Sequence, residues 1–451
     1  MATATKIELN GREDLIFSVT PLRKDSAEKT SQLLQEDLEI HHCFFNYKGF
    51  HNHIPHQLLT IYALGGDPRQ IEKAYEANKV YQRPPVIVND KAVPDMHDPE
   101  HFKQHLGDEN YYHAYLVFFQ QQIQQRGWKD VVQEFIFRGD KRANDMLVRL
   151  FAGVYHPIIY LGFGIEFSQP AIIAEGLAHT AIHEDSLKKF FLGAEEVARQ
   201  KSGKSSFDQN QDASLLELFN DVRKIEKLSV SYTNKWDNGI IPEDVLSWAG
   251  DELVQIAGRY AASEDGLEYK KGEMMNLSAY FVAAAQRPPY IPKLDFFCVH
   301  SITTAIFFTS FLNASFISPS DRVRLLEWKA RLDLAVYASR CAPELLLSEV
   351  QNYTPKMPSD GWPEIISRSL AIQDDGHSTK LIRALAHSAI VCKGLERRDG
   401  IDREALKKLP IVDETMWLSV AHLSIDSMEA GGPRWVGNSA DGWDSVPLRK
   451  A

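Results

Sequence analysis

Three of the chain's 16 histidines lie within six positions, in the run His51-Asn52-His53-Ile54-Pro55-His56. Imidazole is the commonest protein ligand for transition metals and the usual acid or base near neutral pH. The run comes directly before a helical pattern over Gln57–Leu64 that ends at Gly65-Gly66, and Pro55 suits the first turn of that helix. Clustered histidines also cap helices and satisfy buried backbone groups. The run alone therefore allows either a reactive site or a structural one.

Three more histidines occur singly in apolar or glycine-containing surroundings: His156, His300 and His377. A charged imidazole is costly in such places unless it is neutral, hydrogen-bonded or bound to a metal. One such residue is more often a satisfied core histidine. Three of them, together with a histidine of the first run, predict a metal site, although no HExxH or Cys-x-x-Cys motif supports it.

Lys380 lies three residues after His377, so the two share a helix face. Leu381 and Ile382 follow it, and partial desolvation would lower the pKa of its ammonium group and free the amine. A neutral amine can take up carbon dioxide as a carbamate. That anionic oxygen ligand would replace the carboxylate of two-His-one-carboxylate iron sites. The alternative, which the residues alone favour, is a surface ion pair with Asp374 or Asp375 that contributes little.

Other motifs carry less chemistry. His179 and His183 have the i, i+4 spacing that suits a metal, but the adjacent Glu184 and Asp185 favour a solvated helix end. Gly162-Phe163-Gly164 lacks the third glycine and the preceding strand of a dinucleotide fingerprint. We therefore expect no Rossmann-type nucleotide site.

The composition is that of a globular protein with a large core. Its 451 residues are 44% hydrophobic and 25% charged, with a net charge of −11 that argues against binding nucleic acid or anionic membranes. No uninterrupted apolar run approaches the roughly 18 residues that span a bilayer, and the N-terminus lacks the apolar core of a signal peptide. Four cysteines in apolar contexts are typical of reduced, buried thiols. These features predict a cytoplasmic protein.

Helical periodicity dominates the chain. In Asp321–Arg340, for example, Leu325, Trp328 and Leu332 form one apolar stripe. Similar stripes predict helices over 101–125, 131–151, 215–232, 245–262, 296–312, 362–371 and 378–395. Period-two alternation is rare, so we predict an all-α fold. The histidine segments lie on both sides of a polar, turn-rich stretch at 201–212. A shared site therefore favours one large helical domain over 1–451, with 201–212 as a surface linker.

The chain resembles the questin oxidase-like family of fungal and bacterial proteins, which includes Baeyer–Villiger-type enzymes of anthraquinone and aflatoxin pathways. The resemblance extends over nearly the whole chain. The segments that carry it are His51–His56 with Leu58-Leu59 and Tyr62–Gly65, Tyr81–Pro84, His156-Pro157 with Gly162 and Glu166, Asp375–His377 with Lys380–Leu385, and Trp417, His422 and Asp426-Ser427.

The resemblance implies an oxygenase that uses O2 to cleave or ring-expand an anthraquinone-type polyketide in secondary metabolism. It also implies a non-heme iron centre and, for some members, NADPH as reductant. The matching positions would make His56, His156, His300, His377 and a carboxylated Lys380 the metal ligands. His53 would then be a base or a partner of a ligand, and Arg383 would steady anionic oxygens. Tyr160, Phe163 and Tyr290 are candidates for stacking on a planar substrate.

Two other functions remain open at this point. One is a metal-free, NADPH-dependent Baeyer–Villiger monooxygenase in which the histidines act as acids and bases. The other is a helical protein that binds a polyketide without catalysis, which predicts tight binding and no oxygen consumption. The sequence does not determine the oligomeric state.

Overall fold

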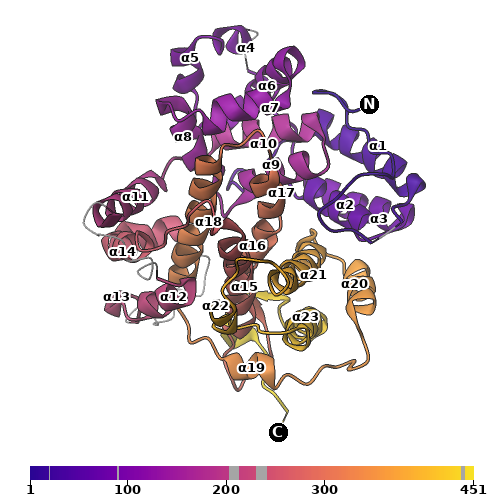
Figure 1. Cartoon of the computed structure of the whole chain (residues 1–451). Helices are drawn as coiled ribbons and strands as arrows, with labels where there is room; N and C mark the ends of the chain where they lie inside the picture. Colours follow the sequence, from indigo (N-terminus) through magenta and orange to yellow (C-terminus); the bar gives the residue numbers. More distant parts are fainter. Residues whose placement is uncertain (20, 89–90, 203–212, 230–240, 438–441, 451) are drawn as a thin grey trace. The chain divides into compact units, whose positions relative to one another are not determined.

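The computed structural model describes residues 1–451 apart from 20, 89–90, 203–212, 230–240, 438–441 and 451. These described residues are predominantly α-helical (Figure 1), and their named strands are two parallel two-residue segments, β1 (Leu294–Asp295) and β2 (Trp435–Val436). The all-α prediction is confirmed. Of the predicted linker 201–212, the first two residues end a helix and the rest lies outside the described residues.

The chain forms two compact units, and each unit is assembled from three separate segments. Unit 1 comprises Met1–Leu187, Phe307–Ser318 and Leu370–Arg383. Unit 2 comprises Lys188–Ile306, Pro319–Ser369 and Ala384–Ala451. The prediction of a single domain over 1–451 stays a prediction.

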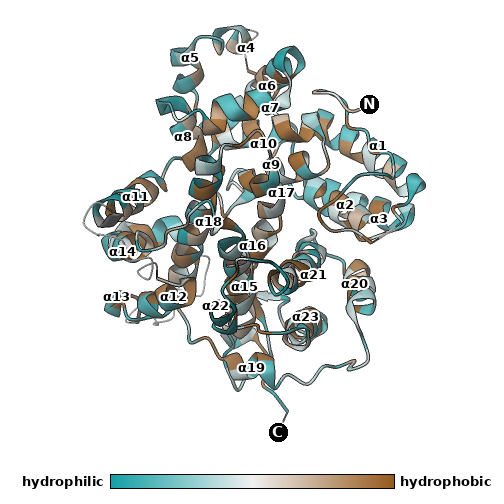
Figure 2. Ribbon diagram, in the orientation of Figure 1, coloured by the Kyte–Doolittle hydropathy of each residue, from teal (hydrophilic) through white to brown (hydrophobic). Residues whose placement is uncertain are grey.

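Unit 1 contains the histidine run and most of the other predicted site residues. Its helices are α1 (Lys24–Ile40), α2 (Ile54–Ala63), α3 (Pro68–Lys79), α4 (Ala92–Asp95), α5 (Pro99–Gln104), η1 (Glu109–Tyr111), α6 (Tyr112–Arg126), α7 (Trp128–Val132), the π-helix η2 (Gln133–Phe137), α8 (Lys141–Leu150), α9 (His156–Glu166), α10 (Pro170–Ile182) and α17 (Phe308–Asn313). Every residue of α9 is buried, and so is every residue of α10 after its first. Figure 2 shows that α3, by contrast, carries both hydrophilic and hydrophobic residues.

Helices α9 and α10 pack with their backbones unusually close. A Cβ added to Gly164 of α9 would lie 2.7 Å from the backbone nitrogen of Ile173. A Cβ added to Gly176 of α10 would lie 2.8 Å from the backbone nitrogen of Leu161. Real Cβ atoms do not approach backbone so closely, so the two glycines are required for this contact.

Unit 2 is also helical. Its helices are α11 (Lys188–Ser202), α12 (Leu215–Arg223), α13 (Glu226–Ser229), α14 (Pro242–Ala257), α15 (Leu267–Ala284), α16 (Phe296–Ala305), α18 (Pro319–Ser339), α19 (Leu347–Gln351), α22 (Arg403–Lys407), α23 (Glu414–Glu429) and η4 (Trp443–Ser445). Two further helices, α20 (Trp362–Ala371) and α21 (His377–Leu395), contain residues of both units.

The helix predicted over 296–312 is interrupted. Helix α16 ends at Ala305 and α17 begins at Phe308, although no glycine or proline marks the break. The whole stretch Phe296–Asn313 is long and apolar enough, by length and composition, to cross a membrane, with a mean hydropathy of 1.4. Since 72% of it is buried inside the protein, we interpret it as core.

Candidate functional site

The asparagine of the histidine run fixes the backbone at the start of α2. Oδ1 of Asn52 accepts the backbone N–H of Ile54 at 2.9 Å, and its Nδ2 donates to both oxygens of Asp37 at 3.0 and 3.1 Å. His53 is the N-cap residue of α2 but its side chain makes no capping hydrogen bond. The backbone N–H at the start of α2 is therefore hydrogen-bonded without a histidine side chain. This excludes helix capping as the role of His53.

A turn with left-handed backbone conformation positions His156. Gly153, Val154 and Tyr155 have φ angles of 54°, 52° and 68°, and His156 follows as the first residue of α9. Each non-glycine residue in this conformation costs about 1–2 kcal/mol. The turn brings the carbonyl of Gly153 to 2.7 Å from Nδ1 of His156.

His377 is positioned by the loop before α21. Gly376 has a φ of 95°, and a Cβ there would lie 2.7 Å from Cβ of Gln57 in α2. Asp375 then reaches Nδ1 of His377 at 2.6 Å. The same carboxylate lies 3.2 Å from Nδ1 of His53.

These elements bring three buried imidazoles together. One ring nitrogen each of His53, His156 and His377 lies within 4.8 Å of the others. The Nε2 atoms of His53 and His156 are 2.9 Å apart. Metal–nitrogen bonds of about 2.1 Å at right angles place two ligand nitrogens about 3 Å apart. The group therefore has the dimensions of a metal site.

The outer hydrogen bonds fix which nitrogens carry protons. A carbonyl and a carboxylate can only accept, so Nδ1 is the protonated nitrogen of neutral His156 and neutral His377. Asp375 favours the same tautomer of His53. The Nε2 lone pairs of His53 and His156 then face each other, and a cation bound between them would remove their repulsion. Metal-bound histidines are typically held in this way by an outer carboxylate or carbonyl, so the residues present fit a metal ion.

His56 and Lys380 lie next to these three histidines: the ring centroids of His56 and His53 are 5.7 Å apart, and burial and then the Lys380 ammonium lower the pKa of both His53 and His377. The side chains of His56 and Lys380 are buried, and among the described residues neither imidazole nitrogen of His56 nor Nζ of Lys380 has a hydrogen-bond partner. Burial lowers the pKa of Lys380 to about 8. Burial, and next the Lys380 ammonium, hold the pKa of His56 well below its usual range. The alternative of a surface ion pair is wrong, because Lys380 is only 4% exposed.

Asp375 is the anionic member of the site. Partial burial works to raise the pKa of its carboxyl, but His377 and then His53 hold that pKa well below the usual range. Its side chain is 32% exposed. An ionised Asp375 therefore orients two imidazoles. Burial lowers the pKa of His377 to about 3, so its ring is neutral at physiological pH.

Arg383 lies one helical turn from Lys380 but its guanidinium is occupied. It donates to both carboxylate oxygens of Glu166 and, at 2.8 and 3.2 Å, to the carbonyl of Phe17. Burial raises the pKa of Glu166 despite this pairing. A role for Arg383 in steadying an anionic oxygen would require this pair to open.

His300, another predicted ligand, belongs to unit 2. It is buried in α16, and its Nδ1 donates to the carbonyl of Phe296 at 2.8 Å. Of the stacking candidates, Tyr160 and Phe163 pack against His56, with ring centroids 4.4 and 5.4 Å away. Tyr290 contacts Trp443 in unit 2, at 5.9 Å.

A second histidine group lies beside the first. One ring nitrogen each of His51, His179 and His183 lies within 4.8 Å of the others. The solvated helix end predicted here is wrong, because His179 and His183 are 0% and 7% exposed. The i, i+4, i+8 spacing of Glu175, His179 and His183 on an otherwise apolar helix was the signal that could have identified them.

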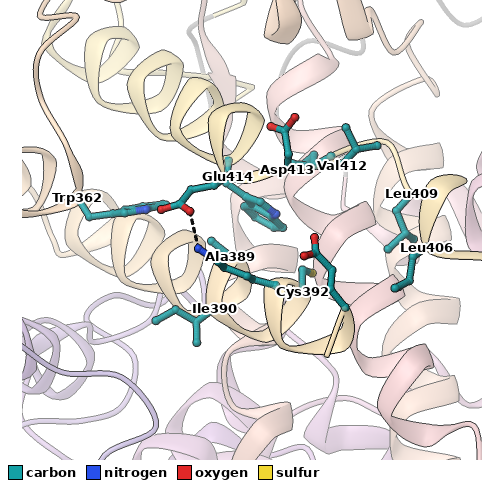
Figure 3. Close-up of a pocket in the computed structure, with 13 residues that line it drawn as sticks. Trp362, Ala389, Ile390, Cys392, Leu406, Leu409, Val412, Asp413 and Glu414 are labelled. Atoms are coloured by element: carbon teal, nitrogen blue, oxygen red, sulfur yellow. Dashed lines mark hydrogen bonds and ion pairs between the residues drawn. The ribbon is translucent and has the colours of Figure 1, made fainter. Parts of the chain in front are cut away.

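Unit 2 contains a cavity of about 350 Å³, shown in Figure 3. Its lining is mainly apolar, with Trp362, Ile390 and Trp417 among the contributors. An ion pair of 2.6 Å between Lys393 and Glu414 lies at its side. No residue of either histidine group lines it.

Comparison with known proteins gives one consistent result. The Questin oxidase-like family model matches residues 50–385. The chain is 36% identical to the Baeyer–Villiger oxidase ptaJ of Pestalotiopsis fici over 94% of each chain. It is 33% identical to the questin oxidase of Aspergillus fumigatus, over 99% of this chain and 100% of the relative. It is 35% identical to the oxidoreductase AflY of Aspergillus parasiticus, over 96% and 86% respectively. With a family match that includes both histidine groups and relatives alike over nearly their whole length, the chain belongs to the questin oxidase-like family.

Proposed function

We propose that this protein is an oxidoreductase of secondary metabolism that uses O2 and non-heme iron to cleave or ring-expand an anthraquinone-type polyketide. The observation that supports bound iron is that one ring nitrogen each of His53, His156 and His377 meet in a buried site. His56 and Lys380 would supply the remaining ligands. This set has His53 where the resemblance suggested His300. The names of the relatives, which include a questin oxidase and Baeyer–Villiger oxidases, support the reaction class.

Lys380 would act as its carbamate. The neutral amine nitrogen forms a bond to the carbon of CO2, and the proton that it loses passes to solvent. A buried amine without a hydrogen-bond partner is suited to this reaction, because its neutral form is favoured there. The carbamate would also offset part of the metal's charge, which four neutral imidazoles cannot do.

The chain's own groups would position this centre. Asp375 orients His53 and His377, and the Gly153 carbonyl orients His156. Bound iron would supply the one-electron redox chemistry that allows O2 to react with an electron-rich aromatic ring. The buried α9 helix keeps water away from the imidazoles on its side.

The electron balance distinguishes two versions of the reaction. A Baeyer–Villiger insertion places one oxygen atom in the product and reduces the other to water, which requires two electrons from a reductant such as NADPH. A ring-cleaving dioxygenation places both atoms in the product and requires none. The ratio of NADPH oxidised to O2 consumed separates them, as does incorporation of ¹⁸O.

Iron analysis of purified protein tests the proposal. We expect His156→Ala and His377→Ala each to lose the iron of this site and to stop consuming O2, with unchanged far-ultraviolet circular dichroism. His101→Ala is the matched control, because His101 is exposed and belongs to neither histidine group. Wild-type iron content in both site variants would exclude this ligand set. Turnover that continues without O2 would exclude an oxygenase.

A further inference from the structure

The second histidine group has its own metal-site geometry. His183 Nδ1 lies 2.7 Å from the carbonyl of His179, so Nδ1 carries the proton of the neutral ring and the Nε2 lone pair points away. That lone pair faces Nε2 of His51 at 3.1 Å. The separation again matches the roughly 3 Å between neighbouring ligands of one metal ion.

The buried imidazole of His179 is the strongest indication that this group binds a metal ion. It is fully buried, and neither of its ring nitrogens has a hydrogen-bond partner among the described residues. Leaving a buried polar group unsatisfied costs about 1–3 kcal/mol. One of these nitrogens lies within 4.8 Å of the ligand atoms of His51 and His183. A metal ion bound to all three would satisfy it.

A glycine lets the backbone pack closely against this group. A Cβ added to Gly153 would lie 2.9 Å from Nε2 of His51, and closer still to Nε2 of His183. Only glycine therefore allows the backbone to come this close to the two imidazole nitrogens, and any side chain at this position would displace them. The ring of Phe44 lies edge-on to the three imidazoles, with centroids 5.2–5.5 Å away, and gives this group an apolar neighbour.

The charges nearby are compatible with a cation. Arg149 donates to the carbonyl of His183, but it is paired with Asp145 at 2.9 Å. Glu175, one turn before His179 on α10, is buried, and its Oε2 has no hydrogen-bond partner among the described residues. Burial raises the pKa of Glu175 well above its usual value, so the metal-free protein holds it as a neutral acid, and a bound cation would favour its ionised form.

We propose that His51, His179 and His183 form a second metal site, specific for a divalent first-row transition metal, beside the proposed iron ligands. Imidazole donors select such ions over Mg²⁺ and Ca²⁺, which prefer oxygen. The two sites would be adjacent, because the rings of His51 and His156 stack with centroids 3.7 Å apart. This proposal does not depend on the oxygenase function.

Metal stoichiometry tests it. The full-length protein is stripped with a chelator, loaded with Zn²⁺ or with Fe²⁺ under anaerobic conditions, and analysed for ions per chain. We expect two ions in the wild type, one in His179→Ala, one in His377→Ala and none in the double variant. If the wild type binds a single ion that only His377→Ala removes, the second site is overturned and the iron proposal stands. If only His179→Ala removes it, the second site stands and the iron ligands are wrong.

Gly153→Ala covers the case in which His179→Ala does not fold. The added methyl group would push the imidazoles of His51 and His183 out of place, while all ligands and the Gly153 carbonyl remain in the chain. We expect it to bind the second ion at least about tenfold more weakly. Gly139→Ala is the control, because Gly139 has a similar positive φ of 79° but nothing within 4 Å of the added Cβ. Equal binding of two ions by both glycine variants would overturn the site.

Discussion

For each imidazole of the proposed iron site, the partner of the outer nitrogen decides what the inner nitrogen can do. Nδ1 of His377 is bonded to Asp375, and Nδ1 of His156 is bonded to a backbone carbonyl. Because the Asp375 carboxylate lies next to Nδ1 of both His53 and His377, removing its charge should alter the orientation of both rings. A backbone carbonyl cannot be removed by substitution, so Asp375 is the accessible test of this arrangement.

Asp375→Asn should weaken iron binding about 10- to 100-fold without removing a ligand. The amide keeps the shape of the side chain but loses the charge that holds both Nδ1 protons. The measurement is the dissociation constant for Fe²⁺ under anaerobic conditions. Asp14→Asn, a surface change in the same unit, should leave it unaltered. An Asp375→Asn protein with wild-type affinity would contradict the orienting role.

Substitutions of Lys380 distinguish two roles for this residue, a carbamate ligand and a simple cation. Lys380→Ala should lose metal and activity, and bicarbonate or a short carboxylic acid should partly restore them. Lys380→Arg should fail as well, because guanidinium stays charged and forms no stable carbamate. Metal analysis and O2 consumption of the two variants provide the test. An active, metal-loaded Lys380→Arg protein would show that the carbamate is not required.

At the scale of elements, the contact between α9 and α10 links the two histidine groups, since His156 opens one helix and His179 lies on the other. Gly176→Ala should destabilise the protein by about 1–3 kcal/mol through overpacking. It should also reduce metal binding. Gly394→Ala, in α21 with nothing within 4 Å of the added Cβ, should be neutral or stabilising by up to about 1 kcal/mol. Urea unfolding measures both, and equal midpoints would contradict the close contact.

The sequence predicted elements better than it predicted which side chains are buried. Apolar periodicity, Pro55 in the first turn and the Gly65-Gly66 pair after the last turn predicted the bounds of α2 closely. The break between α16 and α17 has no sequence marker, so only tertiary packing could produce it. Glu184 and Asp185 wrongly suggested solvent around His179, because they follow the end of α10 and do not share its buried face. Whether Lys380 is buried or at the surface was ambiguous for a related reason. Local sequence does not show what packs against a helix face from segments that are far along the chain.

At the scale of the whole molecule, the buried neutral imidazoles make the metal-free protein sensitive to acid. Burial lowers the pKa of His377 to about 3 and that of His183 to about 4. In the unfolded chain these rings titrate near 6.5, so below that pH the unfolded state binds protons that the folded state does not. Stability should fall from pH 6.5 towards pH 4, by up to about 1.4 kcal/mol per pH unit for each such histidine. Above pH 6.5 this effect is absent.

Urea unfolding of chelator-treated protein between pH 8 and 5 measures this loss. Adding metal at pH 7.5 should raise the unfolding midpoint, since an ion that binds only the folded state at 1,000 times its dissociation constant adds about 4 kcal/mol. His101→Ala should change neither result. A midpoint that is independent of pH in the metal-free protein would contradict the neutral, buried state of these histidines.

The discontinuity of unit 1 has a consequence for biosynthesis. His53 and His377, which meet in one site, are separated by 324 positions (377 minus 53). At roughly 5–20 residues per second, a ribosome needs about 16–65 s to synthesise the chain between them. Once residue 182 has been made, the apolar faces of α9 and α10 exist, but the loop that carries His377 does not. The nascent chain should therefore depend on chaperones until synthesis is nearly finished, and iron could enter the proposed site only after His377 has been made.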